Sequence, residues 1–270
     1  MPTKEKILAV IPARWASVRF PGKPIADILG KPMVQWVSEQ AQKASLVTEV
    51  VIATDDKRIY DVVLSFGGKV VMTSPNHQSG TDRVAEVAKN IECDIVVNIQ
   101  GDEPLIPPEN IDLVIKPLLD SGEFAVSTLM TAISSSSELL DPDICKVVVD
   151  AAGCALYFTR APIPYNRVFE CMDSPNTDSQ MGVNQMVLGH KHIGIYAYKK
   201  SFLLQFSNMK TSRLENIEKL EQLRILENRY SIQVVETEQN SIGVDRPSDI
   251  EKIIKNIVEK TNGENLVDIY

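Results

Sequence analysis

The 270-residue chain has few of the features that mark nucleic-acid, zinc or membrane proteins. Its 28 Lys and Arg residues are outnumbered by 36 Asp and Glu residues, and the net charge of -8 argues against general binding to nucleic-acid phosphates. No CxxC pair occurs, so we expect reduced thiols at the four cysteines, Cys93, Cys145, Cys154 and Cys171. No apolar run reaches the ~18 residues of a membrane span and no secretory signal is recognisable, so we expect a soluble cytoplasmic protein.

What the first half does have is an alternation of strand and helix patterns. Short apolar or β-branched runs predict buried strands at residues 7–11, 50–53, 69–72 and 94–99. Helical patterns lie between these runs, and their expected starts are Pro32, Asp55 or Asp56, and Thr81 or Asp82. This alternation predicts an α/β fold with a mostly parallel central sheet that is covered on both faces.

The second half of the chain is less regular. Strand patterns occur at residues 124–130, 145–149, 155–158 and 192–198, and between the last two of these a polar stretch at about 169–189 predicts a long loop. Helices are expected at residues 214–227 and from about 247 to 259. We therefore expect one α/β domain with a smaller inserted or appended lobe.

A cluster of cations follows the first predicted strand. The loop at residues 12–24 holds Arg14, Arg19 and Lys23, and Gly22 allows its backbone to approach a ligand closely. Ligands of parallel sheets bind beyond the carboxyl ends of the strands, and fixed cations with free N–H groups suit a polyphosphate. The loop matches neither the Walker A motif nor GxGxxG, and a solvated basic loop is the alternative.

Two acidic residues also follow expected strands. Asp102 lies in the segment QGDEP and Asp245 in the segment IGVDRP. Carboxylates at such positions are suited to hold Mg²⁺, although a turn at Asp102 or Glu103 and a helix N-cap at Asp245 are simpler explanations. Two such acids together with the cationic loop indicate a metal-bound nucleoside triphosphate.

Other segments carry possible ligand contacts. The segment 79–83 has free backbone N–H groups at an expected helix start, where an anion or a base can bind. Arg160 and Arg167 flank a Pro-rich turn, and a pair of guanidinium groups suits a carboxylate-bearing substrate. His192 shares one strand face with Tyr196, although a lone strand histidine is more often structural. The helical pattern puts Glu218, Glu221 and Gln222 on one face, which is most simply a solvated face.

Taken together, these segments resemble the 3-deoxy-manno-octulosonate cytidylyltransferase family, the CMP-Kdo synthetases of bacterial lipopolysaccharide synthesis. The matching blocks occur in family order and are IPARWASVRFPGKPIADILGKPM, ATDD, HQSGTDR, NIQGDEPLIPP, YFTRAPIPY, HIGIYAY, LEQLR and GVDRPSDIE. The blocks around Arg160, His192 and Gln222 distinguish this family from other sugar-activating nucleotidyltransferases.

The resemblance implies a Rossmann-like nucleotidyltransferase fold, a homodimer and a Mg²⁺-dependent reaction of CTP with 3-deoxy-manno-octulosonate (Kdo), giving CMP-Kdo and pyrophosphate. It implies one domain over residues 1–270, with a nucleotide-binding core at about 1–125 plus 230–270 and a sugar-binding and dimerisation lobe at about 126–229. The catalytic positions that it implies are Arg14, Lys23, Asp102 and Asp245, of which Asp102 and Asp245 would hold Mg²⁺. The implied nucleotide-binding positions are Pro12, Ala13, Arg14, Lys23, Ser79, Gly80, Arg83 and Asp102. The implied sugar-binding positions are Gln100, Arg160, Arg167, His192, Tyr196, Glu221 and Gln222.

Two departures from the family pattern concern the sugar. Tyr165 stands where the family has Trp, and residues 167–189 differ from the usual connection. They leave open 8-amino-3,8-dideoxy-manno-octulosonate, or another α-keto acid sugar, as the substrate. A nucleotide-binding protein without catalysis and a purely structural subunit are the alternatives from other functional classes.

Overall fold

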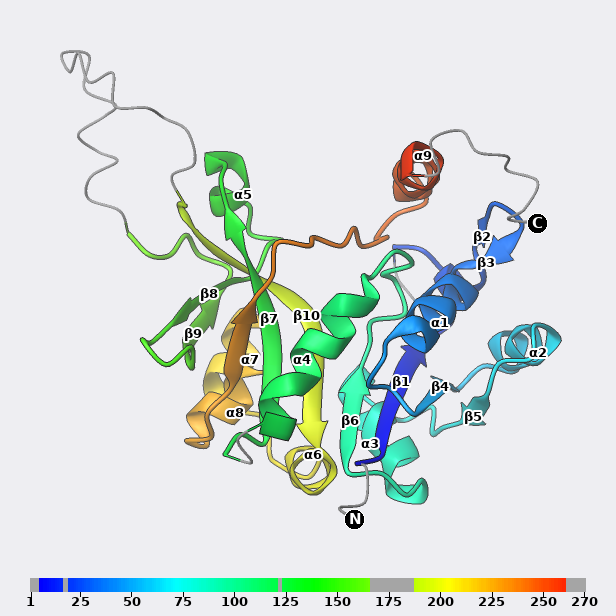
Figure 1. Cartoon of the computed structure of the whole chain (residues 1–270), viewed down its shortest axis with the longest axis horizontal. Helices are drawn as coiled ribbons and strands as arrows, with labels where there is room; N and C mark the ends of the chain where they lie inside the picture. The colour runs from blue at the N-terminus through cyan, green and yellow to red at the C-terminus, as the bar shows by residue number, and fades with distance from the viewer. Residues whose placement is uncertain (1–4, 17–18, 121–122, 166–186, 261–270) are drawn as a thin grey trace.

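The computed structural model describes residues 5–16, 19–120, 123–165 and 187–260, and its centre is a β-sheet (Figure 1). The sheet strands are β1 Ile7–Ala13, β4 Glu49–Thr54, β5 Val70–Met72, β6 Ile95–Asn98, β7 Val126–Ile133, β8 Lys146–Val149, β9 Ala155–Thr159, β10 Gly189–Lys199 and β11 Gln233–Glu236. Within the described residues the strand order is β11-β7-β10-β6-β1-β4-β5, with β8 paired to β10 and β9. A separate two-stranded ribbon joins β2 Asp27–Ile28 to β3 Lys31–Pro32.

Most neighbours along the main path of this sheet run parallel, as predicted. The pairs β6–β1, β1–β4, β4–β5 and β11–β7 are parallel, whereas β10 runs antiparallel to β6, β7 and β8. Both β7 and β10 belong to the expected smaller lobe, yet they lie between β11 and β6. The expected core and lobe therefore share one continuous sheet.

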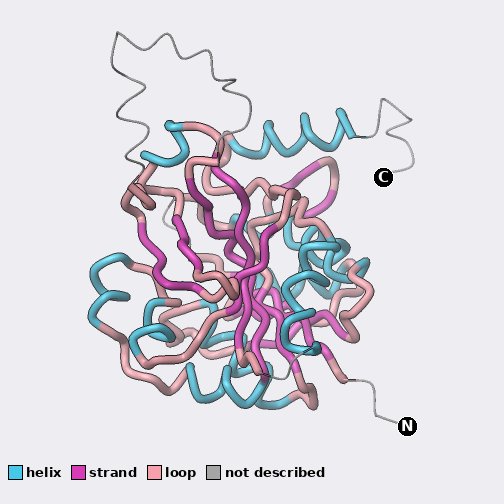
Figure 2. The backbone as a smooth tube through the Cα atoms, turned by 60° about the vertical axis from the view of Figure 1, so that its left-hand side comes forward, coloured by secondary structure: helices cyan, strands magenta, loops and turns pink. Residues whose placement is uncertain are grey.

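Helices cover both faces of the sheet, which Figure 2 shows with the strands between them. The helices α1 Met33–Lys43, α2 Lys57–Ser65 and α4 Pro108–Asp120 contribute to the apolar cluster on one face. The opposite cluster includes residues of α3 Gly80–Asn90, α6 Lys200–Phe206 and α8 Leu223–Glu227, next to α7 Arg213–Glu218. In β1, Ile7 and Ala9 face the first cluster while Leu8 and Val10 face the second. Both faces of this strand are therefore buried, which explains why its sequence is continuously apolar.

The remaining elements lie around the edge of the sheet. A 3₁₀ turn, η1 Lys23–Ile25, follows the cationic loop, and α5 Ser136–Leu140 follows β7. The last helix, α9 Asp249–Lys260, packs through Ile253 on Met33 and Trp36, which form a third apolar cluster. Within the described ranges, no helix is both long and apolar enough to cross a membrane.

The predicted helix over residues 214–227 is wrong as one element, because the structure divides it into α7 and α8. The break is at Lys219, whose φ of 56° is left-handed. The Glu218 carboxylate accepts hydrogen bonds from the Thr159 hydroxyl (2.7 Å) and the Arg160 backbone N–H (3.0 Å). These contacts with β9 anchor the end of α7, so Glu218 does not continue the helical face of Glu221.

A buried ion pair holds α7 against α8, and its loss should destabilise the protein. Arg224 donates to the Glu215 carboxylate through Nε at 2.8 Å, and both side chains are about one-tenth exposed, at 10% and 11%. We expect Arg224→Met to lower the free energy of unfolding by about 3–5 kcal/mol, because Glu215 would be left buried without its cation. Urea denaturation should show this loss, and adding Glu215→Leu should restore most of it. A loss under about 1 kcal/mol in the single variant would contradict the argument.

The segment that joins β11 to α9 crosses over the carboxyl ends of the central strands (Figure 1). It is attached to the sheet at Thr237, whose N–H donates to the Met130 carbonyl at 2.9 Å. Farther along, the Val244 N–H donates to the Asp102 carbonyl at 2.8 Å. This crossing brings Asp245 to the same edge of the sheet as the loops that follow β1 and β6.

Candidate functional site

A cavity of about 320 Å³ opens at the carboxyl ends of β1 and β6. Its lining consists of Pro12, Arg14, Ala16, Lys23, Pro24, Gly80, Gln100, Gly101 and Asp102. The loops meet here because β1 and β6 are parallel neighbours, with Val10 opposite Asn98. At Gly101 a Cβ atom would lie only 2.8 Å from the Pro12 carbonyl oxygen, so this close approach requires glycine. The structure thus gathers the cationic loop, the start of α3 and Asp102 around one space.

Lys23 links the two acids that the sequence singled out. Its ammonium group lies 2.6 Å from an Asp102 oxygen and 4.0 Å from an Asp245 oxygen, and it donates to the Val244 carbonyl at 2.9 Å. Asp245 also accepts from Arg19 at 3.1 Å. Asp245 does not cap α9, because the Asp249 carboxylate accepts the N–H groups of Asp245 and Arg246 there. Asp102 therefore lines the cavity, and Lys23 joins it to Asp245 beside the cavity.

These two carboxylates fit a magnesium ion that is shared with a substrate. Mg²⁺ in proteins is commonly held by one or two carboxylates, with phosphate oxygens and water completing the octahedron. Among the described residues, no group of three or more His, Cys, Asp or Glu side chains is placed to hold a metal alone. The protein part of such a site would consist of Asp102 and Asp245, and the remaining ligands would come from the substrate.

Arg14 carries an unsatisfied nitrogen at the cavity. Its Nη1 donates to the Gln78 carbonyl at 3.2 Å, whereas Nη2 is buried and has no hydrogen-bond partner among the described residues. Burial, followed by repulsion from Arg83, lowers the pKa of Arg14 below its usual value. A buried cationic donor without an acceptor is costly, and a phosphate oxygen in the cavity would satisfy it.

Ser79, rather than Thr81 or Asp82, is the N-cap of α3. Its hydroxyl accepts the Asp82 N–H at 3.1 Å and the Asp82 carboxylate accepts the Ser79 N–H at 3.2 Å, which makes a capping box. The first residue of α3, Gly80, lies against the Pro12 ring, where a Cβ would be 3.4 Å away. The start of α3 is thus fixed beside the cavity.

Arg83 and Ala13 lie behind the cavity surface. The Arg83 side chain is fully buried, and its guanidinium donates to the Thr73 hydroxyl and, at 2.7 Å, to Asp55. Ala13 is buried at the end of β1. The structure therefore places Arg83 as a support for Asp55 and Thr73, and its part in holding the cytidine end, which the resemblance implies, stays a prediction.

A bulge in β10 shapes the second part of the site. Pairing with β7 shifts between Ile193 and Tyr196, and Gly194 lies at this bulge close to Gln100, whose Cγ would be 3.7 Å from a Cβ at Gly194. The strand therefore approaches the cavity at Gln100. His192 and Tyr196 share one face as predicted, with ring centroids 5.3 Å apart.

His192 is a neutral hydrogen-bonding group in this environment. Burial lowers its pKa to about 3. Its Nε2 lies 2.8 Å from the Thr128 hydroxyl, and that hydroxyl lies 2.7 Å from the Ile195 carbonyl. The Thr128 hydroxyl donates its hydrogen to the Ile195 carbonyl, so it can only accept a hydrogen from His192. We therefore place the proton of the neutral His192 ring on Nε2, which leaves Nδ1 as an acceptor.

The other predicted sugar-binding residues surround this strand. Glu221 accepts from the Thr81 hydroxyl at 2.6 Å, and burial raises its pKa. Gln222 is buried beside Cys145, with its Nε2 3.7 Å from the Cys145 sulfur. The Cys145 carbonyl in turn accepts the backbone N–H of His192 at 2.8 Å. Arg160 donates through Nε to the Glu218 carbonyl at 3.0 Å, beside this group. Arg167, the other predicted arginine, lies outside the described residues.

The structure adds four residues to the site that were not assigned from the sequence. Ala16, Pro24 and Gly101 line the cavity, and Arg19 pairs with Asp245. All four lie inside the motifs that surround Arg14, Lys23 and Asp102, so motif membership was the available signal. Small or apolar residues carry no chemical signature of their own, and Arg19 was recognised as a cation without an assigned partner.

Glu103, next to Asp102, should make stability depend on pH. It lies against Ser241, with which it forms a hydrogen bond, and burial raises its pKa from 4.5 to about 7. The folded state then holds this proton more tightly than the unfolded chain, so its contribution to stability falls as the pH rises from 4.5 toward 7. We expect Glu103→Gln to raise the free energy of unfolding at pH 8 by on the order of 1–3 kcal/mol and to change it little at pH 5. Chemical denaturation at both pH values measures this; an equal effect at both would contradict the assignment.

Comparisons with known proteins agree with this geometry. A family model described as Cytidylyltransferase matches residues 8–235. The chain is 52% identical to 3-deoxy-manno-octulosonate cytidylyltransferase of Geotalea uraniireducens, over 93% of this chain and 99% of that protein. It is 51% identical to the protein of the same name from Geobacter metallireducens, over 93% and 98%.

Solved structures give the same answer for the fold. A CMP:2-keto-3-deoxy-manno-octonic acid synthetase in complex with CTP superposes with a TM-score of 0.85 at 41% identity, covering 94% of this chain and 99% of the other. A cytidylyltransferase from Leptospira borgpetersenii, at 15% identity and a TM-score of 0.59 with 96% of each chain covered, shares the fold. The chain belongs to the cytidylyltransferase family, and within it to the 3-deoxy-manno-octulosonate cytidylyltransferases.

Proposed function

We propose that this protein transfers the cytidylyl group of CTP to Kdo, giving CMP-Kdo and pyrophosphate. The observation that carries the proposal is the cavity at the carboxyl ends of β1 and β6, which joins Arg14 and Lys23 with Asp102. Relatives that are about 50% identical over most of the chain carry the name of this activity, and the similar structure with 41% identity is a complex with CTP. A cationic cavity beside paired carboxylates suits a nucleoside triphosphate.

In this reaction the anomeric hydroxyl oxygen of the sugar attacks the α-phosphorus of CTP. The bond between the α-phosphorus and the bridging oxygen breaks, and pyrophosphate leaves while the hydroxyl proton passes to water. Arg14 and Lys23 stabilise the negative charge that grows on the departing pyrophosphate. The buried and unsatisfied Nη2 of Arg14 is fixed beside the cavity before the substrate arrives, so little reorganisation is needed.

We propose Mg²⁺ as the cofactor, with Asp102 and Asp245 as its protein ligands. When bound, Mg²⁺ would supply positive charge at the reacting oxygens and lower the pKa of the attacking hydroxyl. Activation of the hydroxyl by a metal fits the properties of His192 and Glu221, the side chains of this region that could otherwise act as a general base. The pKa of His192, about 3, makes it a poor base, and Glu221 is already bonded to Thr81.

On the sugar side, we propose that Gln100, His192, Tyr196 and Gln222 orient the sugar acid beside the phosphates. Gln100 belongs to the cavity lining and approaches the bulge of β10, so it lies between the nucleotide and sugar regions. We place Arg160 and Glu221 at the edge of the same region, and assign Arg167 the carboxylate of the sugar. Neutral His192 offers Nδ1 to a sugar hydroxyl, a role that needs no change of protonation.

A pyrophosphate-release assay with CTP and Mg²⁺ tests this function. Kdo, its 8-amino analogue and N-acetylneuraminate should be compared, with EDTA as the control. Release with Kdo that EDTA abolishes is the expected result. Preference for the amino sugar would leave the chemistry intact and move the specificity to Tyr165 and the residues after it, while no release with any sugar would contradict the function.

We further propose a homodimer in the cytoplasm, as the resemblance implies. The expected lobe exposes large apolar side chains, including Leu156 at 61% and Val187 at 50%, which would be covered in a dimer. Light scattering should give a molar mass of twice the 30.0 kDa chain. Leu156→Asp should shift the mass toward that of one chain, and a wild-type mass of one chain would rule the dimer out.

A further inference from the structure

Both carboxylates that we assign to Mg²⁺ are already paired with cations of the protein. Asp102 lies 2.6 Å from the Lys23 ammonium, and Asp245 lies 3.1 Å from the Arg19 guanidinium. Lys23 also reaches Asp245 at 4.0 Å. The chain thus neutralises both acids with its own side chains, which come from the loop after β1 and from the first residue of η1.

The two pairs differ in how firmly they are held. The Lys23 side chain is only 14% exposed, and a hydrogen bond to the Val244 carbonyl at 2.9 Å fixes its ammonium group between the two acids. Arg19 and Asp245 are each 55% exposed, so their interaction is screened by water. Lys23 is therefore the stronger competitor for any cation that approaches Asp102.

A metal ion binds these acids only weakly while the ammonium group remains in place, because the two cations repel each other and compete for the same oxygens. A positive charge within 4–6 Å of a carboxylate typically lowers the affinity of that carboxylate for a proton by about 10- to 1,000-fold, and the same repulsion acts on a metal ion. The nucleotide supplies another partner for Lys23, since phosphate oxygens would enter the cavity that Lys23 lines. Arg14 is on the same lining and would draw the triphosphate to this position.

We propose that Lys23 and Arg19 are internal counter-cations, which hold Asp102 and Asp245 together without metal and are drawn away by the triphosphate. This inference rests on the proposed function. It makes Arg19 a positioning residue and gives Lys23 a role before the reaction, in addition to its role at the pyrophosphate. Metal binding and nucleotide binding are then coupled, and free protein has little affinity for the metal alone.

The test measures Mn²⁺ binding to the full chain without nucleotide, by electron paramagnetic resonance of the free ion. We expect weak binding to the wild-type protein and about 10- to 100-fold tighter binding to Lys23→Met. Arg19→Met should tighten binding less, by a few-fold, because its pair is half-exposed. Adding Asp102→Asn to Lys23→Met should abolish the gain, since the ion would lose its carboxylate.

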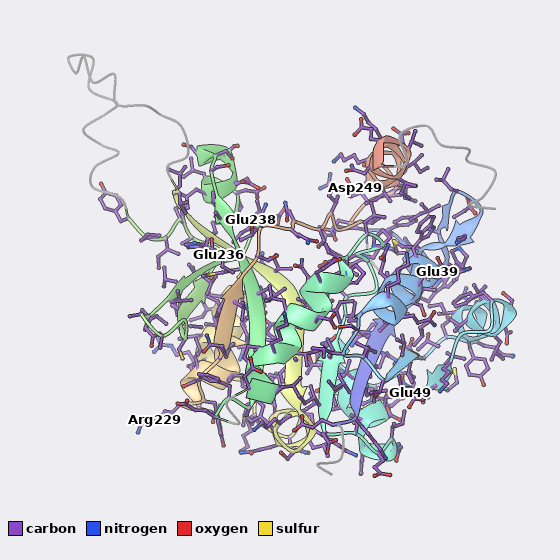
Figure 3. All side chains as sticks on the ribbon, viewed as in Figure 1. Glu39, Glu49, Arg229, Glu236, Glu238 and Asp249 are labelled. Carbon is purple, nitrogen blue, oxygen red and sulfur yellow. The ribbon has the colours of Figure 1, made fainter. Side chains whose placement is uncertain are left out.

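Lys69→Met is the matched control. Lys69 pairs with Glu49 at 3.0 Å, and Glu49 begins β4 at the edge of the sheet opposite to α9 and its Asp249 (Figure 3). This variant should bind Mn²⁺ as the wild-type protein does. Equal Mn²⁺ affinity of Lys23→Met, Arg19→Met and wild type would overturn the inference, as would tight binding to the wild-type protein. Pyrophosphate release by the wild-type enzyme tests the proposed function separately, so the two failures are distinguishable.

Discussion

Asp102→Asn is expected to lower the turnover of cytidylyl transfer by about 10²- to 10³-fold while the fold remains intact. Asp102 lies on the cavity wall, one-third exposed at 33%, and its carboxylate is the acid closest to Lys23. Asparagine keeps the size of the side chain but removes the charge that would attract Mg²⁺ and hold Lys23. The measurement is the rate of pyrophosphate release with saturating CTP and Kdo.

The matched control for this variant is Asp61→Asn. Asp61 lies on α2, is 55% exposed and pairs with Lys57 on the same helix, so its loss should leave turnover unchanged. Circular dichroism should give the same spectrum for both variants and the wild type. Near-normal turnover of Asp102→Asn would contradict the metal assignment, and it would leave the family membership untouched.

The sheet was predictable because its strands carry local signals. The run at residues 7–11 is apolar throughout because helices cover both faces of β1, and the following helix α1 begins directly after Pro32, as predicted. The helix α2 begins after Asp56, one of the two expected caps. In each case the signal lies within a few residues of the element that it predicts, so no knowledge of distant contacts is needed.

Distant contacts explain where prediction failed. Apolar residues do recur at helical spacing over 214–227. The helix breaks at Lys219 because Glu218 accepts hydrogen bonds from Thr159 and Arg160, at the end of β9, and a contact so distant in the sequence leaves no local signal. Nothing in the sequence indicates that Arg83 is buried or that its partner is Asp55, which follows the end of β4.

The part of the site that was predictable consists of motifs that directly follow predicted strands. Asp102 and Lys23 are far apart in sequence, and the rule that parallel strands present their carboxyl ends at one edge was enough to bring their loops together. The position of Asp245 depended on the crossing segment, which is held by the bond between Val244 and Asp102. That bond cannot be read from composition or spacing; the sequence paired the two acids only because each follows an expected strand, and the resemblance added their shared role at Mg²⁺.

Arg14 should be another highly sensitive position of the cavity. Arg14→Met is expected to lower kcat/KM for CTP by about 10³-fold, and Arg14→Lys by about 10²-fold. The guanidinium bonds the Gln78 carbonyl through one nitrogen and has a second, buried nitrogen available for a phosphate. Lysine keeps the charge but lacks the planar fork whose two nitrogens are held at separate positions, so the difference between Arg14→Lys and wild type reports the geometry of the fork. Steady-state kinetics with varied CTP measures both values.

The control for Arg14 is Arg229→Lys, which should leave kcat/KM unchanged: Arg229 is exposed, follows α8 and lies in Figure 3 at the opposite side of the molecule from Asp249. If Arg14→Lys retained wild-type kcat/KM, the charge alone would be sufficient, and the unsatisfied nitrogen would have no part in binding the phosphates. If Arg14→Met retained wild-type kcat/KM, the cavity would not be where the triphosphate binds. The expected order of kcat/KM places Arg14→Lys between Arg14→Met and the wild type. This order requires both the charge and the second hydrogen bond of Arg14 to act on the triphosphate.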